Sequence, residues 1–190
     1  MDQNELAKTA RMALPFFASG TVVHGFGRGS KELGVPTANL ADEVVDNLPD
    51  QLTCGVYCGF ASVNHGTVYP MCLSIGWNPY YKNEKRTMET HIMHSFDKDF
   101  YGEILKIVIV EYIRPMLDFK SLEELKLAIS SDIRISTEKL LEEKCAEFSK
   151  HKFSVHLSST LIDSCRTESS SLSLSNNISL GRVFTASLQS

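Results

Sequence analysis

TCGVYCGFASVNHGTVYPMCLSIGW, the stretch from Thr53 to Trp77, decides the fold class. Its two halves, residues 53–63 and 67–77, are rich in β-branched and aromatic residues, a composition typical of strands. The residues between them, Asn-His-Gly at 64–66, form a turn-prone connection. The sequence therefore predicts an antiparallel hairpin over residues 53–77.

Two further strand candidates follow this hairpin, at residues 87–96 and 103–114. A charged and aromatic loop at 97–102 joins them, and the whole stretch from 16 to 120 has the character of β structure with long loops. No helix-length segment separates these strands, so parallel βαβ units are disfavoured. An antiparallel barrel or sandwich is favoured instead.

One helix is expected after the strands. Ser121 and Glu124 have the spacing of a capping box, with a serine cap and a glutamate three residues later. Apolar residues then recur near the helical period and define one stripe, which predicts packing against the sheet. The stripe consists of Leu122, Leu125, Ile129, Ile133 and Leu140.

The chain of 190 residues is expected to hold one domain at 14–149, with a loose N-terminal extension at 1–13. One third of the residues from 158 to 190 are serine, and they show no apolar periodicity. Such a segment buries too little apolar surface to offset its ordering entropy. Residues 150–190 are therefore expected to be a disordered serine-rich tail.

Several function classes are disfavoured by composition. The formal net charge of −4 argues against non-specific nucleic-acid binding. The longest aliphatic run, Ile107 to Val110, is far shorter than the roughly 20 residues of a membrane span. The odd number of cysteines shows no metal-site spacing and favours buried free thiols. Without a convincing signal peptide, a cytoplasmic location is expected.

Three short segments could carry chemistry. The glycine-rich stretch at 25–31 (GFGRGSK) could cradle an anion or be a mobile turn. Just after it, Pro36 favours an extended chain, which places the oxygen-bearing side chains of Thr37 and Asn39 on one side. They could form a partial Mg²⁺ shell, although a polar turn at a strand edge is favoured without further context. Glu89, in mid-strand, could be a general base lining a pocket or a solvated residue on the wet face.

Two other groups of residues give weaker signals. His91 and His94 fall on opposite faces of the expected strand, which disfavours a zinc site using both. The aromatic turn containing Trp77, Tyr80 and Tyr81 could stack on a planar ligand or plug one end of a barrel.

Taken together, several ordered blocks closely resemble riboflavin kinase (flavokinase), in the monofunctional form common in eukaryotes. The resemblance covers residues 14 to 135. The blocks that carry it are GFGRGSKELGVPTAN at 25–39, VVDNLP at 44–49, SIGWNPYYKNEKRTMETHIMH at 74–94, DKDFYGEIL at 97–105 and YIRP at 112–115.

The resemblance implies a six-stranded antiparallel Greek-key barrel with a C-terminal packing helix. It also implies transfer of the γ-phosphoryl group of ATP to the riboflavin 5′-hydroxyl, giving FMN and ADP. The implied metal is Mg²⁺, with Zn²⁺ or another divalent ion as alternatives. A monomer with no nucleic-acid or membrane partner is expected, and the absence of an adenylyltransferase-like domain ahead of the barrel argues against FAD synthesis.

The resemblance also implies roles for individual residues. Glu89 matches the catalytic glutamate, and Thr37 and Asn39 match the metal ligands. Flavin contacts are implied for Arg114, Leu117 and Phe119. The residues implied to bind ATP are Gly25, Arg28, Lys31, Thr37, Asn39, His94 and Tyr101.

Two other functions compete with this one. A catalytically silent flavin- or nucleotide-binding module would keep the barrel but make no FMN. A small barrel that stacks single-stranded nucleic acid on its aromatic turn would bind oligonucleotides with a steep salt dependence.

Overall fold

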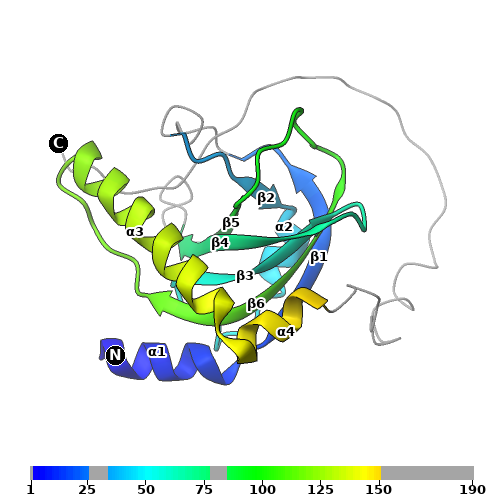
Figure 1. Cartoon of the computed structure of the whole chain (residues 1–190). Coiled ribbons are helices and arrows are strands. Elements are labelled where there is room, and N and C mark those ends of the chain that lie inside the picture. Colours follow the sequence, from blue (N-terminus) through cyan, green and yellow to red (C-terminus); the bar gives the residue numbers. More distant parts are fainter. Residues whose placement is uncertain (1, 26–33, 78–84, 151–190) are drawn as a thin grey trace.

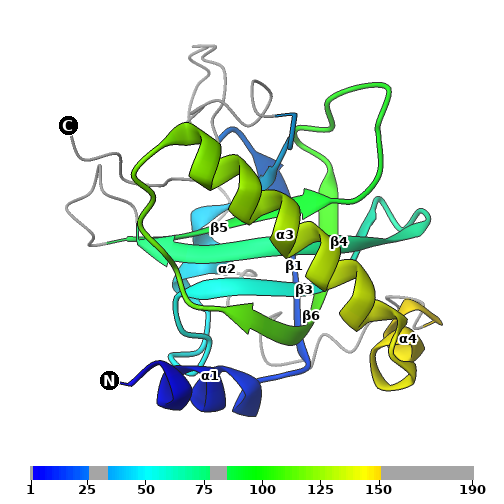
Figure 2. The same cartoon turned by 60° about the vertical axis from the view of Figure 1, so that its left-hand side comes forward.

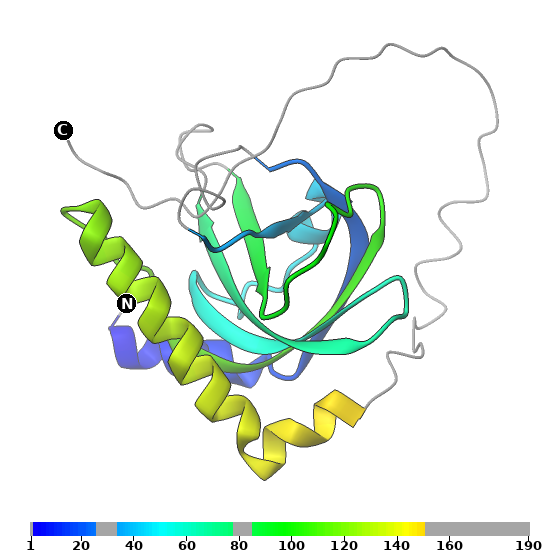
Figure 3. The ribbon, with the colours of Figure 1, turned by 45° about the horizontal axis from the view of Figure 1, so that its top comes forward.

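The computed structural model describes residues 2–25, 34–77 and 85–150. Six antiparallel strands close into a barrel in the order β1-β2-β5-β4-β3-β6, which confirms the predicted fold class (Figures 1 and 3). The strands are β1 (Phe16–Val23), β2 (Ala38–Leu40), β3 (Gly55–Val63), β4 (Val68–Trp77), β5 (Arg86–Ile92) and β6 (Ile104–Arg114).

The predicted hairpin is formed by β3 and β4, which pair from Gly55 opposite Ile75 to Ser62 opposite Val68. Its turn contains the residues expected there, and Asn64 and His65 have φ angles of 49° and 59°. Positive φ at both central residues matches the right-handed twist of the flanking strands. The local sequence therefore sets the register of the hairpin.

The barrel interior is a continuous apolar core. Successive residues of a strand point to opposite faces, so alternate residues of each strand enter this core. On β4 and β5 the inward residues are Met71, Leu73 and Ile75, together with Met88 and Ile92. The residues between them, Ser74 and Glu89 included, therefore point away from the barrel axis.

The part of the chain that the structure describes also contains four helices: α1 (Gln3–Met12), α2 (Asp42–Asp46), α3 (Leu122–Leu141) and α4 (Glu143–Lys150). The long helix α3 crosses the outer face of β3 and β4 (Figure 2). Ser121 caps it as predicted, because its hydroxyl accepts a hydrogen bond of 3.2 Å from the Glu124 backbone N–H. None of these helices, among the residues that the structure describes, is long and apolar enough to cross a membrane.

The buried side of α3 differs from the predicted apolar stripe. Leu122 is 46% exposed, and two polar residues, Asp132 and Ser136, are buried. The buried residues of the helix are Leu125, Ile129, Asp132, Ser136 and Leu140. Because α3 covers the sheet with polar as well as apolar side chains, it can contribute polar groups to a site on the outside of the barrel.

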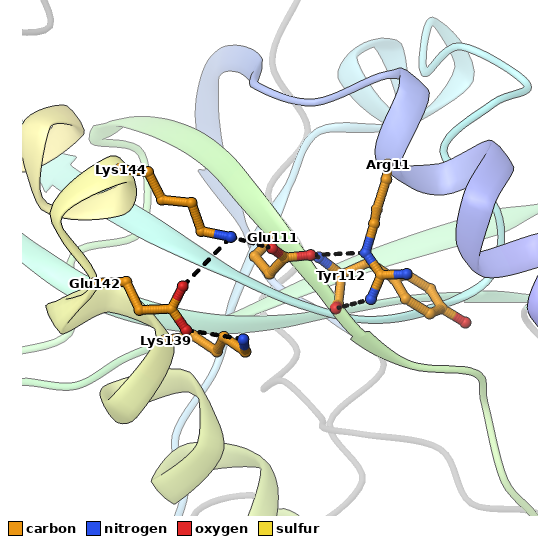
Figure 4. Close-up of polar contacts among 6 residues, drawn as sticks. All are labelled: Arg11, Glu111, Tyr112, Lys139, Glu142 and Lys144. Atoms are coloured by element: carbon orange, nitrogen blue, oxygen red, sulfur yellow. Dashed lines mark hydrogen bonds and ion pairs between the residues drawn. The ribbon is translucent and has the colours of Figure 1, made fainter.

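The N-terminal residues were expected to be a loose extension, and the structure differs. Residues 3–12 form α1, which packs on β6 with Ala10 fully buried. Arg11 Nε donates to a Glu111 carboxylate oxygen at 2.9 Å, and Lys144 of α4 approaches the other oxygen at 3.4 Å (Figure 4). Glu111 thus fastens both terminal helices to β6. The serine-rich tail, from residue 151 on, lies outside the described residues.

This arrangement predicts a pH-dependent contribution to stability. Burial by itself raises the pKa of Glu111, but the hydrogen bonds from Arg11 and the Tyr112 backbone, with the charges of Arg11 and Lys144, outweigh it. The pKa of Glu111 in the folded protein is therefore below its ordinary value. A carboxyl group of this kind stabilises the fold above its unfolded-state pKa, and the effect is lost as pH falls through its folded-state pKa.

We therefore expect Glu111→Gln to lower the thermal unfolding midpoint by a few degrees at pH 7. The difference from the unsubstituted protein should shrink as the pH falls below about 4. Thermal unfolding of both proteins at a series of pH values measures this. A difference that stays constant over that series would contradict the assigned role of the carboxylate.

Candidate functional site

One row of side chains crosses five adjacent strands on the outside of the barrel. Arg114 of β6 is the register partner of Val56, Val56 of Ser74, Ser74 of Glu89, and Glu89 of Asn39. Directly paired residues of antiparallel strands project from the same face of the sheet. The row therefore brings together the candidate base Glu89, the candidate metal ligand Asn39 and the candidate flavin residue Arg114.

Glu89 is on the outer face and is nevertheless buried, at 5% exposure. The sequence left open whether this carboxyl group lines a pocket or lies on a wet face. Its neighbours in the row are also shielded from solvent. Ser74 is 6% exposed, and Asn39 is partly buried. Paired residues have Cβ atoms about 4.5–5.5 Å apart, which places polar side chains on both sides of Glu89. Glu89 is therefore part of a sheltered polar site on the barrel's outer wall.

The segment with the candidate metal ligands joins this site through β2. This strand has three residues, and its pairs with β5 are Ala38 with Thr90 and Asn39 with Glu89. One further step in the same register puts Thr37 opposite His91. Thr37 and Asn39 offer a hydroxyl and an amide oxygen, the neutral oxygen ligands that suit Mg²⁺.

His91 holds the chain just before Thr37. Its Nδ1 lies 2.8 Å from the Pro36 carbonyl oxygen. Burial lowers the pKa of His91, and the hydrogen bond to Pro36 offsets this only in part. Because a carbonyl oxygen can only accept, the neutral ring carries its proton on Nδ1. The His91 side chain thus holds Pro36 to β5, beyond the last backbone pair between β2 and β5.

The candidate nucleotide residues fall into two groups. His24, next to Gly25, stacks on the Tyr101 ring with centroids 3.7 Å apart. The Gly102 N–H donates to the Val22 carbonyl at 2.9 Å, so the Tyr101 loop is fastened to the end of β1, where the glycine-rich segment begins. Arg28 and Lys31 lie outside the described residues.

His94 forms the second group with other aromatic residues. Its ring stacks on Tyr69 at 3.9 Å and meets Phe96 edge-on at 4.9 Å. Phe96 in turn contacts Phe100, the residue before Tyr101, at 4.8 Å. The ring of His94 thus belongs to this aromatic cluster, which joins it indirectly to the Tyr101 loop.

The segment after β6 carries the candidate flavin residues. Leu117 is 43% exposed, and Met116 lies over Gly76, two residues from Ser74 on the same face of β4. The Arg114 guanidinium lies 5.9 Å from the centre of the Phe119 ring. This segment therefore extends over the outer face at the end of the row that Arg114 occupies.

Sequence reasoning missed two polar residues of this region, Ser74 and Asp132. Ser74 flanks Glu89 in the row, and Asp132 of α3 binds Arg114 through two hydrogen bonds of 2.7 and 2.6 Å. A signal for Asp132 was present in the sequence, because it lies three residues after Ile129 on the barrel-facing side of the helix. Ser74 gives no such signal without the strand register.

A cavity of about 230 Å³ lies elsewhere, between α1, β6 and α4. It is lined by Leu14, Val110 and Phe148, and by three of the charged side chains drawn in Figure 4, those of Arg11, Glu111 and Lys144. It contains none of the candidate residues of the row, and its charges are already paired with one another. We therefore assign the candidate site to the outer wall.

The chain matches a protein-family model over most of its length. The Flavokinase model, which describes riboflavin kinase, matches residues 12–140. Human riboflavin kinase is 59% identical over 127 residues, 67% of this chain and 82% of the relative. Mouse riboflavin kinase is 59% identical over 128 residues, 67% of this chain and 83% of the relative. The crystal structure of riboflavin kinase from Trypanosoma brucei has a TM-score of 0.61 and 33% identity, and the match covers 77% of this chain and 93% of that one.

Proposed function

Since the chain belongs to the riboflavin kinase family, enzymes that convert riboflavin to FMN, we propose that ATP is its phosphoryl donor and that Glu89 is its general base. We further propose that a divalent ion, Mg²⁺, assists at Thr37 and Asn39. The observation that carries this proposal is the direct register pairing of Glu89 with Asn39 on one sheltered face. It puts a proton acceptor beside a candidate metal ligand.

The proposed reaction forms one P–O bond and breaks another. The 5′-hydroxyl oxygen of riboflavin attacks the γ-phosphorus of ATP, and the bond from that phosphorus to the bridging oxygen of ADP breaks. Glu89 accepts the proton of the hydroxyl group. Phosphoryl transfer depends mainly on alignment and charge neutralisation, so a weak carboxylate base that orients the hydroxyl is sufficient.

The oxygen atoms of Thr37 and Asn39 would hold the metal ion. When bound, the ion neutralises phosphate charge during transfer. The fixed position of these two side chains follows from the β2–β5 pairing and from the His91 contact with Pro36. This chain's contribution is therefore to keep two oxygen ligands beside the base.

We propose a separate group of residues for each substrate. The segment at 25–31, with His94 and Tyr101, is proposed to hold the nucleotide. Arg114, Leu117 and Phe119 are proposed to hold the flavin ring. The described cysteines are free thiols, which suits the reducing cytoplasm, and we propose that the protein acts there as a monomer.

Incubation of the full chain with ATP, MgCl₂ and riboflavin, followed by chromatographic separation of FMN, tests the proposed function. Formation of FMN and ADP in equal amounts is the expected result. Riboflavin binding with no FMN formed would instead identify a silent flavin-binding module. Salt-sensitive oligonucleotide binding with no FMN formed would favour the nucleic-acid alternative.

The metal assignment gives a separate prediction for Asn39→Ala. Loss of one oxygen ligand should raise the Mg²⁺ concentration for half-maximal rate by about 10-fold, as expected for a weakened metal site. Initial rates over a series of MgCl₂ concentrations measure this. Asn47→Ala is the matched control, because Asn47 is exposed and its amide donates to the Glu43 carbonyl, outside the row. A Mg²⁺ titration of Asn39→Ala that matches this control would remove Asn39 from the metal site.

A further inference from the structure

Asp132 is a buried acidic residue on the side of α3 that faces the barrel. Its exposure is 5%, and the same side of the helix carries the fully buried Ser136. An ionised carboxylate is costly to bury unless a charge or several hydrogen bonds compensate it. A residue of this kind in a position where an apolar one would pack calls for a specific partner.

The partner is Arg114, at the end of the row that contains Glu89. Arg114 Nε donates to Oδ1 of Asp132 at 2.7 Å, and Nη2 donates to Oδ2 at 2.6 Å. This two-point geometry fixes the plane of the guanidinium as well as its position. Arg114 Nη1 also donates to the Pro115 carbonyl at 2.9 Å. The orientation of Arg114 is therefore set by Asp132 of α3 and by the backbone carbonyl of the next residue, Pro115.

These contacts leave part of Arg114 available. The guanidinium has five N–H donors, of which the contacts above use three. Its central carbon lies over the Phe119 ring, 5.9 Å from the ring centre. Two donors and an adjacent aromatic ring are suited to a flat heterocycle that carries carbonyl oxygens.

We propose that Asp132 is a positioning residue for flavin binding, which holds Arg114 in the orientation that receives the flavin ring. This inference rests on the proposed function, in which Arg114 and Phe119 contact the flavin. A free arginine side chain loses considerable rotamer entropy when it binds a ligand, whereas a side chain already held by an ion pair loses less. Asp132 thereby increases affinity for riboflavin without touching it.

The position of the pair in the row connects it to catalysis. Arg114 and Glu89 are three strand spacings apart, which is about 14 Å along the sheet. A ring system with a five-carbon chain can extend from one to the other. Holding the ring at the Arg114 end therefore also helps to place the 5′-hydroxyl near Glu89.

The test measures riboflavin binding to the full chain by quenching of flavin fluorescence, with ADP and MgCl₂ present so that no turnover occurs. Asp132→Asn should raise the Kd for riboflavin by about 10-fold, a coupling of ordinary size for residues in contact. In steady-state assays its KM for riboflavin should rise similarly, with kcat and the KM for ATP changed by less than about twofold. The double variant with Arg114→Gln should bind no more weakly than Arg114→Gln alone.

Two control variants test whether the loss of a charge on α3, or a loss of stability, is enough to weaken riboflavin binding. Glu138→Gln removes the same charge from α3, at an exposed ion pair with Arg134. Leu140→Ala weakens the packing of α3 on the barrel away from Asp132, since Leu140 packs with Cys58 and Val108. Both should bind riboflavin like the unsubstituted protein, and Leu140→Ala should have a lower thermal midpoint.

Each outcome of the experiment decides a separate point. If Arg114→Gln weakens binding but Asp132→Asn does not, or if Asp132→Asn tightens it, the positioning role is overturned and the proposed function stands. If Arg114→Gln leaves binding unchanged, the flavin role of Arg114 fails, and this inference fails with it. Should Asp132→Asn not fold, Asp132→Glu decides: it keeps the ion pair but displaces Arg114, so binding weakened by about threefold supports the inference and unchanged binding overturns it.

Discussion

Glu89→Gln is expected to lower kcat by at least about 10²-fold while ATP binding stays intact, because the amide cannot accept the proton of the attacking hydroxyl. Glutamine has nearly the same shape as glutamate, so the buried position on β5 remains filled. The paired residues Ser74 and Asn39 keep their places in the row. The substitution therefore removes the proposed proton acceptor with little change to the surrounding structure.

The measurement is a single-turnover rate of FMN formation, together with ATP affinity from equilibrium binding. Glu103→Gln is the matched control, since it makes the same chemical change at an exposed residue outside the row. Its rate should equal that of the unsubstituted protein within about twofold. Near-normal turnover by Glu89→Gln would exclude Glu89 as the general base.

The second large effect is on folding, and it concerns Gly59. The β3–β6 ladder changes register between Cys58 and Gly59, where the two backbones approach closely. A Cβ atom at residue 59 would meet the Val108 carbonyl carbon at 2.9 Å and would lie still closer to its oxygen. Both atoms belong to the backbone of β6, so no side chain can move aside. Gly59→Ala must therefore displace the strand that leads to Arg114.

We expect Gly59→Ala to lose at least about 4 kcal/mol of stability, the range reached by severe core disruptions. Since domains are stable by about 5–15 kcal/mol, the variant should give little folded protein. Soluble yield and urea unfolding measure this. Gly76→Ala is the control, because a Cβ atom on Gly76 meets only the flexible end of Met116, at 3.5 Å. If Gly59→Ala unfolds at the same urea concentration as the control, the close approach of β3 and β6 does not limit stability.

The central hairpin was predictable because its signals are local. Strand-forming residues on both sides of residues 64–66 define β3 and β4 without reference to the rest of the chain. By contrast, β2 is too short for a periodic pattern to appear in the sequence, and its pairing with β5 joins residues about fifty positions apart. These three residues form a strand because they pair with β1 and β5 in the closed barrel.

Helix α1 was not predicted for a related reason. Its attachment depends on the pairing of Arg11 with Glu111, two residues far apart in the sequence. The segment is short and its buried residue is an alanine, so apolar burial by itself would hold it only weakly. Tertiary contacts therefore decide the conformation of residues 3–12, which the sequence pattern left as a loose extension.

The candidate site was predictable in composition but not in position. Strand alternation puts Glu89 and His91 on one face, yet it cannot say whether that face is core, solvent or a sheltered outer wall. The structure decides this, because Glu89 points away from the core and is still only 5% exposed, beside its 6% exposed partner Ser74. Likewise, the expected helical stripe ran through Ile133, whereas the buried residue is the neighbouring Asp132. Leu125, Ile129 and Leu140 are buried as expected, so the difference that lets this helix hold Arg114 is the burial of Asp132.

Opposite faces of the same strands serve the core and the candidate site. Leu73 and Met88 fill the barrel, while their neighbours Ser74 and Glu89 belong to the row outside. Volume-conserving exchanges of interior aliphatic residues are well tolerated in protein cores. An engineer could therefore redesign the centre of this barrel for heat resistance while leaving every candidate substrate contact untouched, and selection during evolution has had the same freedom.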